Sequence, residues 1–228
     1  MNWANQVNGA MQWAYAMIRI SFIWILFSFP YVVLYLGLLL ADDVNSVGGT
    51  LGVAILLMPF IFVPSIVAML GLCKRLLQSS SDFGQALVNY WKYYRRDYFK
   101  SVLIGAVYVG LLIIFYIAYY YYSHSFNLLS IFFLVLFYLT LVAFTYSLCF
   151  LSDRKLSMKQ YIQNGYLFVL FHPINTLIMI CGMFLSYFIL SNILPMALCI
   201  IFIPCTFGLV AMALYNKGIN QEIEKASE

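Results

Sequence analysis

Long apolar runs separated by shorter polar breaks dominate this chain. A helix that crosses the hydrocarbon core of a bilayer needs roughly 20 apolar residues. Runs of about this length lie near 18–40, 50–72, 101–122, 128–151, 174–191 and 193–215. Lipid offers the backbone no hydrogen-bond partner, so these runs are expected to be helices. The pattern predicts an all-α fold, a polytopic transmembrane bundle of about six spans that forms one membrane domain over residues 1–228.

Two of the polar breaks are very short. Ser123–Asn127 and Ser191–Asn192 leave little chain between the runs beside them, so those runs are predicted to form antiparallel hairpins. An alternative exists for the last hairpin, because its first run is short and Pro195 and Pro204 interrupt its second. This hairpin would then dip into the membrane without crossing it.

The longer breaks carry amphipathic segments. Residues 82–100 place apolar side chains three and four positions apart, and Asp82 with Gln85 has the spacing of a helix capping box. The pattern recurs 75 positions later, where Ser157 and Gln160 have the same spacing. Interfacial helices are therefore predicted near 82–100 and 157–171. The recurrence indicates either an internal duplication or two surface loops that are amphipathic independently.

Composition and charge support a membrane location. Apolar residues make up 64% of the chain and charged residues 9%, too few charges to cover a soluble domain of this size. All 12 Lys and Arg residues fall on one side of the predicted topology. Because basic residues near span ends stay in the cytoplasm, the long loops and both termini are predicted to be cytoplasmic.

The sequence offers no recognisable catalytic site. Ionisable residues are absent from the middle of every predicted run, and the chain contains no phosphate-binding loop, nucleophile elbow or zinc-protease motif. His124 and His172 have no second ligand at metal-binding spacing, and are interpreted as solvated or capping residues. The five cysteines are interpreted as small buried apolar residues. We expect a protein that is not an enzyme and holds no metal or cofactor.

Two groups of residues remain candidates for function. A surface that docks a partner or lipid headgroups is predicted at Trp91, Lys92, Arg95, Arg96 and Lys100, although orientation alone would also explain its charge. Helix kinks are predicted at Pro59, Pro64, Pro195 and Pro204. Kinks occur in ordinary bundles and also in transporters, where they line a substrate path. Nucleic acid is not an expected partner, because the basic segment is short and lies against the membrane.

Three segments resemble the YesL-like family of bacterial integral membrane proteins. They are LFSFP at Leu26–Pro30, VPSIVAMLGLCKRLL at Val63–Leu77, and FGQALVNYWKY at Phe83–Tyr93. The resemblance implies a bacterial plasma membrane protein without established biochemical activity, encoded beside genes for sugar uptake and polysaccharide use. The loops at 73–100 and 152–173 lack the sequence by which a sugar-importer permease grips its ATPase.

Together these observations predict a non-enzymatic accessory or docking partner of another membrane complex, linked to carbohydrate uptake. The alternative is a small transporter or channel with a path near the proline-kinked second and sixth spans.

Overall fold

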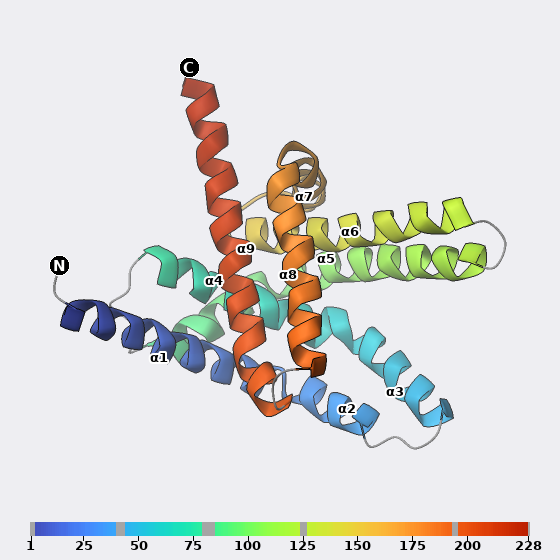
Figure 1. Ribbon diagram of the computed structural model, residues 1–228, viewed down its shortest axis with the longest axis horizontal. Coiled ribbons are helices and arrows are strands. Elements are labelled where there is room, and N and C mark those ends of the chain that lie inside the picture. The colour runs from blue at the N-terminus through green and yellow to red at the C-terminus, as the bar shows by residue number, and fades with distance from the viewer. Residues whose placement is uncertain (1–2, 40–43, 79–84, 124–126, 193–195, 228) are drawn as a thin grey trace.

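The computed structural model describes residues 3–39, 44–78, 85–123, 127–192 and 196–227, and every element in these ranges is a helix (Figure 1). The predicted all-α class is confirmed. In chain order the elements are α1 (Trp3–Phe27), α2 (Phe29–Leu39), α3 (Val44–Leu57), the π-helical turn η1 (Met58–Phe62), α4 (Val63–Gln78), α5 (Ala86–Ser123), α6 (Asn127–Asp153), α7 (Met158–Phe171), α8 (Pro173–Asn192) and α9 (Met196–Ser227).

The long helices pair as hairpins, and in Figure 1 the α8–α9 pair runs across the direction of the α5–α6 pair. Figure 1 shows α5 running beside α6 and α8 beside α9, and both pairs are in contact. The N-terminal end of α1, the end of α4, the start of α5 and the end of α9 lie toward the left and top of this view. The opposite ends of α2 and α3, of α5 and α6, and of α8 and α9 lie toward the right and bottom. We call the part of the bundle that carries Lys74, Lys92 and Arg154 the basic end.

The structure supports fewer spans than the sequence predicts. Within the described residues, three helices are long and apolar enough to cross a membrane: Val47–Gln78, Ala86–Ser123 and Leu128–Asp153. A fourth is added if Met158–Phe171 and Pro173–Leu185 count as one broken span, although they are bent by 98°. The count of about six is not confirmed; the first predicted run is divided between α1 and α2, and Met11–Phe27 is too short to count as a span by itself.

The predicted interfacial helix at 82–100 is not a separate element. Residues 86–100 form the first part of α5, which continues unbroken to Ser123. The predicted boundary followed the change from polar to apolar side chains, but such a change does not end a helix, and residues 86–104 contain neither proline nor glycine. Asp82, half of the predicted capping box, lies outside the described residues.

The second predicted interfacial helix is an element of its own. Ser157 caps α7, Gln160 completes the capping box, and the Ser157 backbone N–H donates to Gln160 Oε1 at 3.0 Å. Pro173 lacks an N–H and begins α8, so the chain turns sharply after His172.

A chain of buried hydroxyl groups links α4 and α5 to the break between α1 and α2. Tyr90 donates to the backbone oxygen of Ser65 at 2.9 Å, so its hydroxyl oxygen accepts from Ser65 Oγ at 2.8 Å. Ser65 Oγ in turn accepts from Ser28 Oγ at 2.7 Å. All three side chains are fully buried. One tyrosine proton thus sets the direction of the whole chain of hydrogen bonds.

Close helix crossings depend on glycine. A Cβ atom at Gly165 in α7 would lie 2.0 Å from Ser147 Oγ and 2.7 Å from the backbone oxygen of Ala143 in α6. That backbone cannot move without separating the two helices. By contrast, a Cβ atom at Gly110 in α5 would meet nothing within 4 Å.

The Gly165 crossing predicts a specific loss of stability. Gly165→Ala should lower the free energy of unfolding by about 1–3 kcal/mol, because overpacking pushes α7 off α6. Unfolding in detergent is followed by a thiol-reactive dye, since Cys73, Cys149 and Cys205 are buried in the folded chain. Gly110→Ala is the matched control and should leave the unfolding temperature unchanged or raised. Equal effects of the two substitutions would contradict the crossing.

Candidate functional site

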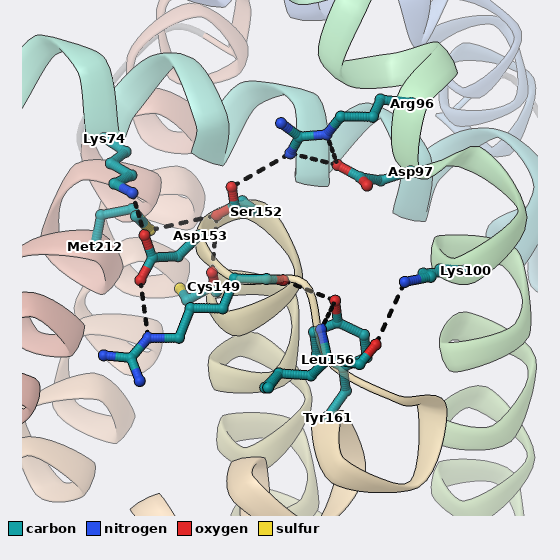
Figure 2. A network of polar contacts seen from close by, with 11 residues as sticks. Lys74, Arg96, Asp97, Lys100, Cys149, Ser152, Asp153, Leu156, Tyr161 and Met212 are labelled. Carbon is teal, nitrogen blue, oxygen red and sulfur yellow. Dashed lines mark hydrogen bonds and ion pairs between the residues drawn. The ribbon is translucent and has the colours of Figure 1, made fainter.

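The carboxylate of Asp153, at the end of α6, contacts polar groups from α4, from α9 and from the residue that follows α6. Its Oδ1 pairs with Lys74 Nζ of α4, its Oδ2 accepts from the Tyr215 hydroxyl of α9 at 2.7 Å, and Arg154 Nε lies 3.5 Å from the same oxygen. Figure 2 shows Lys74 and Asp153 pointing toward each other. These four residues, Lys74, Asp153, Arg154 and Tyr215, are the Asp153 cluster.

The cluster is partly shielded and carries one excess positive charge. The side chains of Lys74 and Asp153 are 23% and 16% exposed, and that of Arg154 is 47% exposed. One carboxylate faces two cations, so Asp153 is saturated with partners while Arg154 still reaches solvent. The arrangement links the ends of helices and leaves the Arg154 guanidinium exposed to solvent. These four side chains provide no activated nucleophile and no acid–base pair.

Two of the predicted site residues, Arg96 and Lys100, contact backbone oxygens on either side of Asp153 in the sequence. Arg96 pairs with Asp97 at 2.6 Å and reaches the backbone oxygen of Ser152, in the last turn of α6, at 3.5 Å. Lys100 donates to the backbone oxygen of Leu156, in the connection between α6 and α7, at 3.3 Å (Figure 2). These cations therefore hold α5 against the end of α6 and the connection that follows it.

Tyrosines complete this connection. The Tyr161 hydroxyl donates to the Arg154 oxygen at 2.7 Å and accepts from the Leu156 N–H at 2.8 Å. The backbone oxygen of Tyr161 accepts from Ser147 Oγ at 3.0 Å, and Ser147 Oγ accepts from the Tyr108 hydroxyl at 2.7 Å. Ser147 thus links α5, α6 and α7 through hydrogen bonds. Because Ser147 Oγ lies against position 165 of α7, only glycine fits there.

The other predicted site residues lie on the outside of α5. Lys92 and Arg95 are exposed, and Trp91 is 51% exposed. The Trp91 ring is parallel to that of Tyr94, 6.0 Å between centroids, and contacts Phe27 of α1 at 5.8 Å. The sequence placed the five residues on one surface, but the structure separates Trp91, Lys92 and Arg95 from Arg96 and Lys100, the two residues that contact the end of α6 and the connection after it.

Of the candidate kink residues, Pro204 lines a cavity. Pro59 lies in the π-helical turn, where the Val63 N–H bonds the Met58 oxygen, and Pro64 lies in the first turn of α4. Pro204 lies inside α9, which continues through it, and Pro195 is outside the described residues. Met58 and Phe62 of the π-helical turn and Pro204 of α9 line a cavity of about 330 Å³. Almost all of its wall is apolar.

The histidines and cysteines are spread along the sequence. No group of three or more His, Cys, Asp or Glu side chains that could hold a metal ion occurs among the described residues. His124 lies outside them, and His172 ends α7, is 9% exposed and pairs with Glu222 at 3.3 Å. The interpretation of His172 as a capping residue is correct, and the interpretation as a solvated residue is wrong. Its contact with Glu222 could not be predicted from local sequence spacing, because the two residues are 50 positions apart. Cys181 is exposed, unlike Cys73, Cys149 and Cys205.

The fold and site define a class: an all-helical chain with several helices able to cross a membrane and a polar cluster at one end of its bundle. Residues 17–119 match the family described as "Protein of unknown function, DUF624". No curated protein and no solved structure matches the chain.

The Asp153 cluster predicts a charge-dependent loss of stability. Asp153→Asn keeps the shape of the side chain but leaves Lys74 without its counter-ion, and should cost about 1–3 kcal/mol of unfolding free energy. The loss should disappear in part when Lys74→Met is added, because the uncompensated cation is then removed. Unfolding temperature in detergent measures both variants.

Asp97→Asn serves as the comparison for Asp153→Asn. Asp97 pairs with the adjacent Arg96 on the same helix, so its loss should cost less. Additive effects of Asp153→Asn and Lys74→Met would show that the two side chains do not interact.

Proposed function

We propose that this chain is a non-enzymatic protein of a bacterial plasma membrane that docks onto another membrane complex through the first part of α5. The observation that carries the proposal is an exposed face on that segment with both apolar and basic side chains. We name it the α5 stripe; it consists of Leu87, Val88, Trp91, Lys92, Arg95 and Phe99.

Helix geometry explains why these residues share one face. At 100° per residue, the members of the stripe fall within about 140° of the helix surface. Ala86 and Tyr90 lie on the opposite face and are buried. Exposed fractions on the stripe reach 61% at Val88 and 81% at Phe99. An apolar face with two cations suits a partner that presents apolar and acidic side chains together.

The length of α5 supports a location for the stripe beyond the hydrocarbon core. Its 38 residues span about 57 Å, whereas the core is about 30 Å thick. The segment that carries the charges is the N-terminal one, so the excess length falls at the basic end. A partner can then reach the stripe from the aqueous side or from the headgroup region.

The proposed topology has six crossings: α1 with α2, α3 with α4, α5, α6, α8 and α9. Both termini and the basic end are on the cytoplasmic side, in accord with the tendency of Lys and Arg to remain there. A tilted α8 of 20 residues is long enough for one crossing.

The suggested partner follows from the resemblance to the YesL-like family. Its setting beside sugar-uptake genes makes a carbohydrate transporter the first complex to test. The match to a family of unknown function over residues 17–119 is compatible with this setting but assigns no partner.

A second candidate function is a small transporter or channel. The cavity beside the π-helical turn and Pro204 favours it, because interrupted helices at a cavity are typical of substrate paths. The apolar wall suits an apolar solute rather than a sugar.

Charge reversal of the α5 stripe tests docking. Lys92→Glu with Arg95→Glu should abolish recovery of transporter subunits when the tagged protein is purified from native membranes in mild detergent, because like charges then face the partner. Mass spectrometry of the bound proteins gives the readout. Arg96 is left unchanged, since its contacts with Asp97 and Ser152 would confuse the result.

Lys217→Glu is the control for the charge change, as Lys217 is an exposed lysine on α9 away from the stripe. It should leave recovery of the subunits intact. Undiminished recovery with both stripe substitutions would contradict docking at this face.

Substitution of the prolines tests the transport alternative. Pro64→Ala and Pro204→Ala restore a backbone N–H to the helix and should straighten it. A flux of apolar solute into liposomes would then fall for each variant if the interrupted helices line a path. A flux that exists and is indifferent to both substitutions would rule the path out.

A further inference from the structure

The cavity beside the π-helical turn has features of a binding site of its own. Its wall is built from α1, η1, α4, α5, α6 and α9, helices that are far apart in the sequence. Its volume of about 330 Å³ is in the range of pockets that hold small organic ligands. This volume corresponds to about ten waters in the liquid, but an apolar wall gives them almost nothing to bond.

One polar group at the wall lacks a partner. Trp24 of α1 lines the cavity and is 8% exposed, and its buried Nε1 has no hydrogen-bond acceptor within the described chain. The other polar side chain in the wall, Thr145, donates to the Leu141 oxygen of its own helix at 3.1 Å. Because Trp24 Nε1 is covered by protein and Thr145 is already bonded, the wall offers a ligand almost only apolar surface, and a ligand suited to this site is apolar.

The depth of the cavity matches the upper part of a lipid tail. Leu70 of α4, Leu148 of α6 and Ala211 of α9 line it, four or five residues before Lys74, Asp153 and Tyr215 respectively. At 1.5 Å per residue this places the near edge of the cavity about 6–8 Å from the Asp153 cluster, and Leu141 and Ile203, 12 positions before Asp153 and Tyr215, extend its wall farther from the cluster. A phospholipid whose headgroup lies at the basic end has its ester oxygens and first methylene groups at this depth.

We propose that the cavity binds one acyl chain of a bilayer phospholipid, which packs against the Trp24 side chain in its wall. This site goes beyond docking at the α5 stripe and does not depend on it. Lipid surrounds the bundle at very high concentration, so a modest preference fills the cavity by mass action. The lipid replaces the packing contacts that an empty cavity lacks between the π-helical turn and α9.

Quenching of Trp24 fluorescence by bromine-labelled phospholipid tests the proposal. A protein with Trp24 as its single tryptophan is made by Trp3→Phe, Trp13→Phe and Trp91→Phe. The reference has Trp24→Phe and Phe22→Trp added, because position 22 is 68% exposed on the same helix. With phospholipid brominated near the ester end of its chains, Trp24 should be quenched nearly as strongly as the tryptophan at position 22.

Substitutions that fill the cavity should protect Trp24 from quenching by the brominated lipid. Thr145→Phe and Ala211→Leu, each made alone in the Trp24-only protein, should remove most of the quenching, since both residues line the cavity. Val135→Phe is the matched control, because Val135 is 50% exposed on α6 and outside the cavity. It should leave the quenching unchanged. The unfolding temperature shows whether each cavity-filling variant folds. If one of the two does not fold, the quenching measured in the other one tests the proposal.

Two results would overturn the proposal. In the first, Trp24 stays unquenched while the tryptophan at position 22 is quenched, which is expected if only the bundle surface meets lipid. In the second, Trp24 is quenched equally with and without the cavity-filling substitutions in folded protein. Neither result bears on recovery of a partner by the α5 stripe, so the two proposals fail separately.

Discussion

The pairing of Asp153 with Lys74 is the interaction on which the arrangement of the bundle depends. It joins the ends of α4 and α6 across 79 positions of sequence, and Tyr215 adds α9 to the same carboxylate. Charged groups are costly to place beside apolar helices unless they are paired, so both must meet at the edge of the apolar region. That requirement fixes the level at which these helices end, and the connection between α6 and α7 follows directly from it.

Contacts farther along the helices are set by hydroxyl groups and glycine rather than by charge. Ser65 and Ser147 each accept from one hydroxyl and donate onward, and each thereby links helices that share no charged pair. Glycine lets backbones approach where packing alone must supply the stability, as is usual for helices in a membrane. A Cβ atom at Gly218 in α9 would lie 2.2 Å from the Phe168 ring of α7, so the same device recurs at a second crossing. Such close contacts between helices are missing at the cavity beside the π-helical turn.

The sequence predicted the helices well and their connections poorly. Apolar runs reveal helices because lipid leaves the backbone no alternative, and the Ser157 capping box was correct to the residue. The boundary placed at Ser101 was wrong, because side-chain polarity changes there while helix propensity does not. Site residues were harder. Arg96 and Lys100 carry the same charge as Lys92 and Arg95, and only the fold shows that the first pair faces the α6–α7 connection. Asp153 was missed because its partners come from other helices.

Photo-crosslinking from α5 in living cells tests the central claim, docking through the α5 stripe, most directly. A photoreactive phenylalanine analogue is placed at Val88 on the stripe or at Ile117 farther along the same helix, since the two residues are almost equally exposed, at 61% and 60%. The account predicts a crosslink from position 88 to one membrane protein and none to that protein from position 117. Crosslinks to the same protein from both positions, or from neither, would contradict it.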